Sequence, residues 1–371
     1  MLTRSLWAVV RGGSGLLVAC FVVGYTAPYL PPDTFWWANL LAAGLWPLAL
    51  GTGGVTLALA GTAIYLQRWG LGAVALVLAA LLASRFGPSL GAQTSSQLSS
   101  DSLRVMSFNV PGLTLQEGGE KNLAALLARE QPSVLAFQES RVHVPASADR
   151  NISVSPSLRA VFRGDTGYAL PQSLPFRTVI QQPVFGRIPL DSLRVFPLPP
   201  AGDSSARSRF TRTHFQWRGR PVVLFNLHLH TVGSMRPWDA SGGWTDWNRW
   251  RTFLHTYRTG VRRRAEQARV VRRAIERTTA PVLVTGDFNS TRHQWAYRHI
   301  AKGLQDAVGE QGRGWGATFP AARPLVRIDH VLAGPEWQIQ SARVPSLDGY
   351  EGLSDHRPVV ATLQWRPPAA E

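Results

Sequence analysis

The sequence predicts an α/β domain that is preceded by three transmembrane helices. Three long uncharged stretches fill most of the first 85 residues, and short apolar runs alternate with helical patterns in the rest of the chain. Several of these runs end abruptly in polar side chains, which is typical of buried strands that deliver chemical groups at their ends. The chain has 371 residues, which is enough for one large domain and such an accessory segment.

The N-terminal region is predicted to be a membrane anchor. Its stretches without a charged residue are residues 12–32, 34–67 and 69–84. Because about 20 apolar residues cross a bilayer, each stretch predicts one transmembrane helix. We place these helices near residues 10–31, 36–60 and 66–85. A soluble core cannot absorb three such stretches in succession, so residues 1–86 are assigned to the anchor.

Arginine residues predict the orientation of this anchor. Arg4 and Arg11 lie at the N-terminal side of the first helix, and Arg68 lies in the short turn before the third. Positively charged loops tend to remain in the cytoplasm, so the N-terminus and Arg68 are expected to face it. Three crossings then place the C-terminal domain outside the cytoplasm.

Charge and cysteine content limit the classes of partner and of metal site. The formal net charge is +16, and arginine carries almost all of the positive charge because Lys121 and Lys302 are the two lysines. A basic chain attracts polyanions, although frequent arginine can also reflect a GC-rich genome. Cys20 is the single cysteine, which excludes an intrachain disulfide and a cysteine-based zinc site.

A stretch rich in glycine, serine and glutamine separates the anchor from the rest of the chain. Residues 87–102 are predicted to form a flexible linker. The domain follows at residues 103–366, and residues 367–371 are a short tail. Beyond residue 95 the net charge is +13, because four arginines and one aspartate before that point carry +3 of the total.

The stretch Pro281–Ser290 (PVLVTGDFNS) carries the strongest local signal for chemistry. Its apolar run Val282–Val284 indicates a buried strand, and Gly286 permits a tight turn where the strand ends. Asp287 and Asn289 follow two residues apart, so both side chains can face the same way. A carboxylate beside an amide suits work on phosphate, because one holds a metal or a proton and the other donates to developing negative charge.

Other elements of the domain follow from the same patterns. Further strands are expected at Leu103–Val110, Val134–Phe137, Val222–Leu229, Arg327–Leu332 and His356–Leu363. The polar residues at or beside their ends are Asn109, Glu139, Asn226, His228, Asp329 and Asp355. The apolar spacing predicts helices at Asn122–Arg129, Val261–Arg277 and His293–Gly303. Residues 218–220 (RGR) read as a hairpin turn, and residues 152–215 hold several strand-like runs broken by proline and glycine.

The ordered blocks SFNV, FQES, NLHL, GDFN, RIDHVL and SDHRPV resemble those of the endonuclease/exonuclease/phosphatase family. They run in family order from Leu103 to about Leu363; each block alone is a weak or moderate signal, and six in order are a strong one. The resemblance implies a four-layer α/β sandwich, with two mainly antiparallel β-sheets packed face to face and flanked by helices. The leading membrane helices further resemble a membrane-anchored bacterial subset, which implies the inner (cell) membrane as the location.

Oxygen ligands predict the metal. Glu139, Asn109 and Asp355 offer such ligands, and without a cysteine cluster a hard divalent cation is expected, Mg²⁺ or alternatively Mn²⁺. The cation would neutralise a phosphate oxygen and the leaving group. Asn109 has a second interpretation, because asparagine often does no more than close a turn.

The residues expected to carry out catalysis are His356, Asp329, His228, Asp287 and Asn289. His356 is the candidate that activates or orients the attacking water, and by the resemblance Asp329 fixes its tautomer. His228 would contact the scissile phosphate, Asn289 would orient or stabilise it, and Asp287 would be either the base or a second metal ligand. Two nearby histidines receive no role: His230 and His330.

The substrate is predicted less directly. Residues 236–253 carry four tryptophans among three arginines, a composition that suits stacking of nucleic-acid bases or contact with lipid headgroups. A surface helix that packs its tryptophans on the domain is an equal alternative. The expected activity is metal-dependent phosphodiester hydrolysis, first on DNA or RNA and alternatively on a phospholipid or small phosphate ester, sphingomyelinase-like or inositol-phosphatase-like. A different class, a non-catalytic membrane-anchored binding protein with this fold, is the third hypothesis, and the sequence indicates no protein partner.

Overall fold

The computed structural model describes most of the chain: residues 2–86, 101–111, 119–146, 151–162, 166–199, 209–231, 245–312, 316–350 and 352–366. Most of the predicted linker, the predicted tail, Trp238 and Trp244 lie outside these ranges. The chain divides into two units, one of residues 1–90 with 293–298 and the other of residues 91–292 with 299–371.

Long apolar helices make up the first unit. They are α1 (Leu2–Thr26), the short 3₁₀ turn η1 (Ala27–Tyr29), α2 (Pro32–Ala43), α3 (Leu45–Leu66) and α4 (Trp69–Phe86). Three spans are long and apolar enough to cross a membrane: Trp7–Tyr29, Leu45–Leu66 and Trp69–Phe86. The prediction of three membrane helices is therefore confirmed.

The second of these spans begins later than the sequence predicts. A single helix over residues 36–60 was expected, but Gly44 (φ −94°, ψ 23°) separates α2 from α3. Pro47 explains the position of the break, because proline has no N–H to donate and is tolerated only within the first turn of a helix. Pro47 lies in the first turn of α3, so the membrane span starts at Leu45.

Five strands form the first sheet of the second unit, in the order β13-β14-β1-β2-β6. Their bounds are Trp337–Arg343, Val359–Trp365, Leu103–Asn109, Val134–Gln138 and Val184–Gly186. β1 and β2 are parallel, and the other neighbours are antiparallel. The sheet is therefore mainly antiparallel, as the resemblance implied.

Six strands form the second sheet, in the order β11-β12-β10-β9-β8-β7. Their bounds are Gln305–Asp306, Asp329–Ala333, Val282–Asp287, Arg220–His228, Arg209–Trp217 and Leu190–Pro197. β9 and β10 are the parallel pair here. The turn between β8 and β9 is the expected hairpin, in which Arg218 and Gly219 both have positive φ (53° and 75°).

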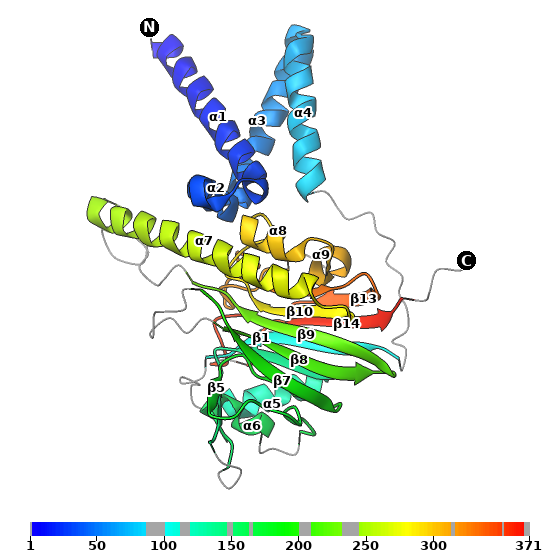
Figure 1. The fold of residues 1–371 in the computed structure, drawn as a ribbon. Coiled ribbons are helices and arrows are strands. Elements are labelled where there is room, and N and C mark those ends of the chain that lie inside the picture. The colour runs from blue at the N-terminus through cyan, green and yellow to red at the C-terminus, as the bar shows by residue number, and fades with distance from the viewer. Residues whose placement is uncertain are drawn as a thin grey trace. The chain divides into compact units, whose positions relative to one another are not determined.

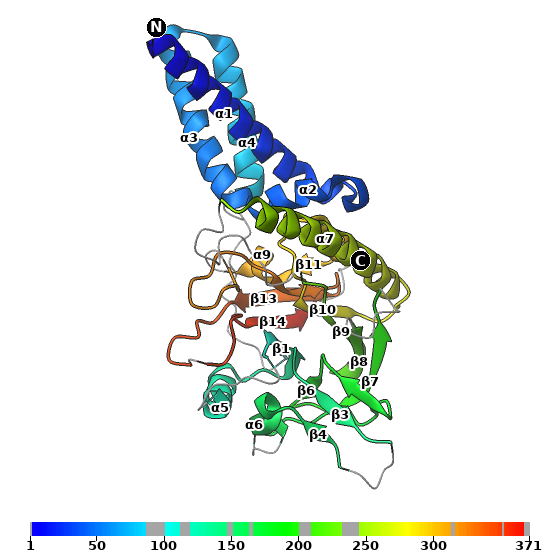
Figure 2. The ribbon, with the colours of Figure 1, turned by 90° about the vertical axis from the view of Figure 1, so that its left-hand side faces the viewer.

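The two sheets pack face to face around one apolar core. One buried apolar cluster contains residues of both sheets. Phe108 and Phe137 come from the first sheet, and Leu224, Leu283 and Val331 come from the second. Helices cover the outside: α7 (Trp247–Glu276) lies on one side of the sandwich, and α5 (Gly119–Glu130) and α6 (Arg159–Phe162) lie on the other (Figures 1 and 2). The predicted four-layer sandwich is therefore confirmed.

Smaller elements complete the described chain. They are the 3₁₀ turn η2 (Pro156–Leu158), the helix α9 (Ala307–Gln311), and the strands β3 (Val142–Val144), β4 (Ser153–Val154) and β5 (Thr178–Ile180). The helix α8 (Trp295–Ala301) starts within residues 293–298 of the first unit and ends in the second. The three short strands form a separate antiparallel sheet in the order β4-β3-β5. The sequence predicted strand-like runs in part of this region but not this sheet.

Helix α7 is longer than predicted. The sequence placed its start at Val261, whereas the helix begins at Trp247, directly after Asp246. The Asp246 carboxylate accepts hydrogen bonds from the backbone N–H groups of Asn248 (2.9 Å) and Arg249 (3.2 Å), which is an N-cap. The cap brings Trp247 and Trp250 into the helix, and the tryptophan-rich segment therefore includes its first turn.

Candidate active site

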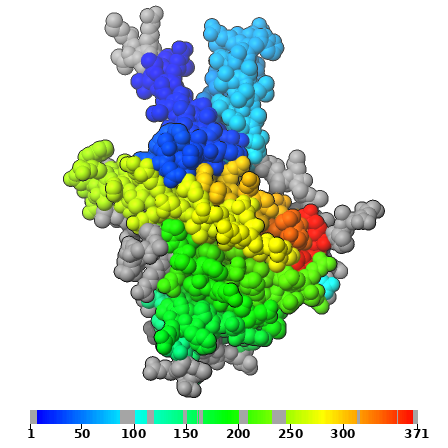
Figure 3. Space-filling model, viewed as in Figure 1, coloured from blue at the N-terminus to red at the C-terminus, as the bar shows by residue number. Residues whose placement is uncertain are grey.

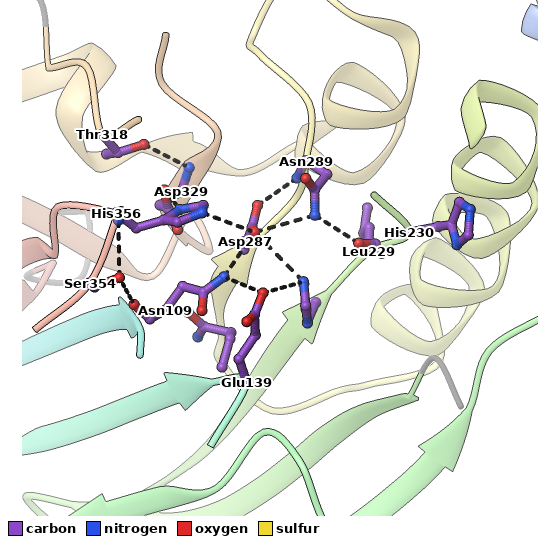
Figure 4. A network of polar contacts seen from close by, with 12 residues as sticks. Asn109, Glu139, Leu229, His230, Asp287, Asn289, Thr318, Asp329, Ser354 and His356 are labelled. Atoms are coloured by element: carbon purple, nitrogen blue, oxygen red, sulfur yellow. Dashed lines mark hydrogen bonds and ion pairs between the residues drawn. The ribbon is translucent and has the colours of Figure 1, made fainter. Parts of the chain in front are cut away.

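Polar side chains from both sheets meet where four strands end (Figure 4). In the first sheet Asn109 ends β1 opposite Gln138 of β2, and in the second His228 ends β9 opposite Asp287 of β10. Antiparallel β12 begins at Asp329, which also lies opposite Asp287. Residues that are distant in the sequence are thereby brought to one edge of the sandwich.

Asp287 lies at the centre of this cluster. Its Oδ1 accepts a hydrogen bond from the backbone N–H of Asn289 (2.7 Å), and its Oδ2 accepts from the side-chain amides of Asn109 (3.1 Å) and Asn289 (3.2 Å). The Nε2 atoms of His228 and His356 lie 3.7 Å and 4.0 Å from the same Oδ2. One buried carboxylate is thus surrounded by amide and imidazole groups.

The pKa of Asp287 is raised above that of an ordinary aspartate. Burial is the largest cause, and the negative charge of Asp329 adds to it. The neighbouring imidazoles of His356 and His228 act in the opposite direction, as does the hydrogen bond from the Asn289 backbone. A carboxylate with a raised pKa is a better proton acceptor near neutral pH than a free one.

Unusual backbone conformations place these groups. Gly286 has a φ of +139°, and a Cβ atom on it would lie 2.0 Å from the carbonyl oxygen of Leu227 on the neighbouring strand. Glu139 and Asn289 also have positive φ, 59° and 47°. Such conformations are uncommon for residues other than glycine and gather at functional sites, where surrounding structure holds them.

Glu139 and His228 form the more open side of the cluster. Their side chains are 44% and 23% exposed, whereas Asp287 is almost fully buried. The His228 Nε2 lies 3.6 Å from Glu139 Oε1, and the Asn109 amide donates to that same oxygen at 3.1 Å. A ligand from solvent would therefore reach Glu139 and His228 first.

A second buried pair joins His356 to Asp329. The His356 Nδ1 lies 2.9 Å from Asp329 Oδ2, and the Thr318 hydroxyl accepts hydrogen bonds from the backbone N–H groups of Ile328 (3.1 Å) and Asp329 (3.3 Å). Ser354 accepts from the His356 N–H (3.0 Å) and donates to the carbonyl of Asn109 (2.6 Å). Asp329 therefore holds the imidazole from the second sheet, and Ser354 ties the His356 backbone to the end of β1 in the first.

The pKa of His356 is raised to about 10. Burial acts to lower it, but the charge of Asp329 and the hydrogen bond to Asp329 outweigh burial, and Asp287 and Asp355 contribute further. An imidazole with such a pKa is a cation at neutral pH. His356 therefore places a positive charge beside Asp287 and Asp329.

The donor set fits a divalent cation. Asp287, Asp329 and His356 place possible ligand atoms within 4.8 Å of one another, and all three residues are buried. Because the His356 imidazole is protonated at neutral pH, the two carboxylates are the ligands that this group would offer. Asp329 Oδ1 is buried and has no hydrogen-bond partner among the residues that the structure describes. Carboxylate and amide oxygens are the ligands of hard cations such as Mg²⁺. A cation at this edge would offset the negative charge that raises the pKa of Asp287.

Two of the three predicted metal ligands lie in the cluster around Asp287, and the third, Asp355, is exposed. Glu139 and Asn109 hydrogen-bond to each other within the cluster. Asp355 is exposed, and its backbone carbonyl accepts a hydrogen bond from the N–H of Ala321 (2.6 Å). The compact buried group contains Asp287 and Asp329 in its place, so the role of Asp355 stays a prediction.

Two residues that the sequence did not predict support the site, and two nearby histidines lie apart from it. Ser354 and Thr318 were not predicted; Ser354 lies within the SDHRPV block, but nothing in the sequence connects Thr318 with Asp329. His330 Nε2 contacts the carbonyl oxygen of Ser290 (2.9 Å), and burial lowers the pKa of His330 to about 4. The ring of His230 points toward α7 and away from Asp287 in Figure 4, and burial lowers the pKa of His230 to about 4.

A pH-dependent stability is expected for the metal-free chain. The His356 pKa is higher in the folded state (about 10) than in the unfolded state (6.5), so folding binds a proton to this group. Its contribution to stability should be complete below pH 6.5 and be lost as the pH rises through 10. Thermal unfolding with chelator should show a wild-type midpoint that falls over this range relative to His356→Asn. Parallel midpoints would contradict the assigned pKa.

Comparison with known proteins gives consistent matches. A model of the "Endonuclease/Exonuclease/phosphatase family" matches residues 106–356. Among solved structures, a protein of that description from Beutenbergia cavernae is 21% identical (TM-score 0.50) over 73% of each chain. A second, from Bacteroides vulgatus, is 19% identical (TM-score 0.51) over 71% of this chain and 99% of its own. D. rerio TDP2 complexed with a single-strand DNA product is 16% identical (TM-score 0.50) over 71% and 100%. No curated protein matches.

Proposed function

The chain belongs to the endonuclease/exonuclease/phosphatase family, and on this premise we propose that it is a membrane-anchored, divalent-metal-dependent phosphodiesterase whose substrate is DNA or RNA. The observation that supports the proposal best is the meeting of two parts at one edge of the sandwich. The first is the carboxylate and amide cluster around Asp287, and the second is the pair His356–Asp329. Phosphodiester hydrolysis needs both, because a water must lose a proton while negative charge develops on the phosphate.

Asn109, Glu139 and Asp355 are the proposed metal ligands, with Asp287 beside them. A bound Mg²⁺ or Mn²⁺ would neutralise a phosphate oxygen and the leaving group. Because Glu139 is half exposed while Asp287 is buried, the ligand set extends from the solvent into the cluster. A substrate phosphate can therefore enter from the side of Glu139 and His228.

We assign proton transfer to Asp287 and charge stabilisation to His356. The raised pKa of Asp287 suits a base, and the His356 imidazolium suits a donor to a phosphate oxygen. Asp329 holds the His356 ring by its Nδ1 and leaves Nε2 directed at the cluster. His228 Nε2 lies at the open side, where it can reach the same phosphate.

Asn289 acts on the base in this arrangement. Its side-chain amide donates both to Asp287 Oδ2 (3.2 Å) and to the Leu229 carbonyl (2.9 Å), so it holds the carboxylate in place. Its backbone N–H donates to the other oxygen of the same carboxylate. Asn289 therefore orients Asp287, and through it the attacking water.

The reaction class is tested with a substrate panel. The full chain in detergent should hydrolyse a phosphodiester from a panel of DNA, RNA, phospholipids and small phosphate esters when Mg²⁺ or Mn²⁺ is present. A chelator should abolish the activity, because the proposed cation neutralises the phosphate oxygen and the leaving group. A chain that binds these ligands but hydrolyses none of them would favour the non-catalytic alternative. Undiminished activity in chelator would contradict the metal dependence.

Salt dependence distinguishes nucleic acid from the lipid and small-molecule alternatives. The net charge of +13 beyond residue 95 favours a polyanion, and Figure 3 shows α7, which carries several of the arginines, on the surface of its unit. For duplex DNA the logarithm of affinity should fall with the logarithm of salt concentration at a slope of about −0.9 per phosphate contacted. A flat response would favour a substrate with a single phosphate.

Trp247, which is 71% exposed at the start of α7, is a candidate for stacking on nucleic-acid bases. Trp247→Ala should weaken single-strand binding by about 1–3 kcal/mol.

The location of the domain is a further part of the proposal. We place the chain in the bacterial inner membrane with the catalytic domain outside the cytoplasm, because three crossings follow an arginine-flanked N-terminus. A phosphatase reporter fused after Arg366 should then be active outside the cytoplasm. Activity of a cytoplasm-specific reporter at the same point would contradict this orientation.

A further inference from the structure

A polar layer lies between the two sheets, directly beneath the candidate active site. It consists of Ser107, Gln138, Asn226 and Thr285, and all four residues have no measurable exposure. The Gln138 amide donates to the Asn226 side-chain oxygen across the sheets (2.6 Å) and to the Ser107 hydroxyl (3.3 Å). The Thr285 hydroxyl lies 3.5 Å from that Asn226 oxygen. The layer therefore connects β1 and β2 of one sheet with β9 and β10 of the other.

Each member of the polar layer precedes a residue of the site on the same strand or, for Gln138, directly after the strand ends. Side chains two apart on a strand share a face, so a member two residues earlier lies directly below its site residue. The pairs are Ser107 with Asn109, Asn226 with His228, and Thr285 with Asp287, while Gln138 immediately precedes Glu139. All four strands that end at the site contribute to the layer.

The composition of the layer is unfavourable for stability alone. A buried amide costs free energy unless it is hydrogen-bonded, and most of the buried residues between the sheets are apolar. Gln138 Oε1 has no hydrogen-bond partner among the residues that the structure describes. Asn226 meets part of this cost through bonds to the Phe137 carbonyl (2.8 Å) and the Pro183 carbonyl (3.4 Å), again across the sheets.

Directional bonds can do what apolar packing cannot. The site is divided between the sheets: Asn109 must lie 3.1 Å from Asp287, and His228 must lie close to Glu139. Apolar side chains tolerate a small slide of one sheet on the other, whereas a hydrogen bond weakens steeply with distance and angle. A misplacement of about 1 Å can cost about 10²-fold in rate.

We propose that the polar layer of Ser107, Gln138, Asn226 and Thr285 is a positioning layer that holds the two sheets in the register at which the site residues meet. This inference rests on the proposed hydrolase function and deepens it. The four residues touch neither substrate nor metal; they act through Asn109, Glu139, His228 and Asp287.

The double variant Gln138→Met/Asn226→Leu tests the proposal. It replaces both partners of the Gln138–Asn226 hydrogen bond with apolar side chains of similar size, so neither amide is left buried without the other. The full chain should keep its unfolding temperature, while kcat falls and the Kd for Mn²⁺ rises, each by about 10–100-fold, with little change in KM. A purely structural role predicts the opposite pattern, in which activity and metal affinity follow the unfolding temperature.

A matched pair of single variants covers the case in which the double variant does not fold. Thr285→Val removes a hydroxyl of the layer, and Thr213→Val makes the same change on β8, at a buried hydroxyl that has no hydrogen-bond partner among the described residues. Thr285→Val should lower kcat and Mn²⁺ affinity at least about threefold, and Thr213→Val should leave both unchanged. The proposal is overturned if Thr285→Val, Thr213→Val and the wild type all bind Mn²⁺ with the same affinity. It is also overturned if none of the three proteins binds Mn²⁺. A wild-type chain that binds Mn²⁺ but hydrolyses nothing contradicts only the proposed function.

Discussion

His356→Ala is expected to lower the rate of phosphodiester hydrolysis by about 10²–10³-fold, which is the usual cost of removing one donor to developing negative charge. The change removes the imidazolium that lies 2.9 Å from Asp329 and 4.0 Å from Asp287, and with it the positive charge that faces the developing charge on the phosphate. Initial rates at saturating substrate and Mg²⁺ measure the effect. The loss should appear in kcat, because the interaction strengthens in the transition state.

Two controls make this result specific. His356→Asn fills more of the space beside Phe319, whose ring centroid lies 4.9 Å from that of His356, so its loss of activity cannot be attributed to a cavity. His255→Ala changes an exposed histidine on α7 and should leave the rate unchanged. A His356→Asn protein with wild-type kcat would contradict the assignment of His356.

Gly286→Ala is expected to destabilise the catalytic unit by more than about 4 kcal/mol, a magnitude reserved for a severe backbone or core defect. The added Cβ would lie 2.0 Å from the Leu227 carbonyl oxygen, and the φ of +139° is itself unfavourable for alanine. Relief requires β9 and β10 to separate at the residues that precede His228 and Asp287. Chemical denaturation of the full chain measures the loss, and any protein that remains folded should be inactive.

Gly219→Ala is the matched control for this prediction. Gly219 also has a positive φ (+75°), but a Cβ atom there would meet nothing within 4 Å. It should therefore show only the cost of a left-handed backbone, about 1–2 kcal/mol. Similar losses for the two variants would show that contact with Leu227 is not the cause.

Local patterns in the sequence predicted the membrane helices and several strands and helices of the domain, whereas the four-layer sandwich was implied by the family resemblance. The uncharged stretches predicted the three membrane helices, and the apolar run before Asp287 predicted β10, because burial and hydrophobic periodicity are properties of neighbouring residues. Patterns were weaker at boundaries. Gly44 and Pro47 divide a stretch that is uniformly apolar, and Asp246 starts α7 fourteen residues before its apolar periodicity becomes evident.

The sequence by itself determined which strands end in polar residues, and thus that Asn109, Glu139, His228, Asp287 and His356 were candidates. Only the tertiary structure decided which of these groups touch, because the distance between strand ends depends on sheet order and on the register of one sheet against the other. The same dependence hid the Thr318 contact with the Asp329 backbone and the bond from Gln138 to Asn226, which join residues that no local pattern connects. The tertiary structure also showed that Asp355 is exposed and lies outside the buried group of Asp287, Asp329 and His356. Asp355 and His356 are adjacent, and the side chains of adjacent residues before a strand face different directions.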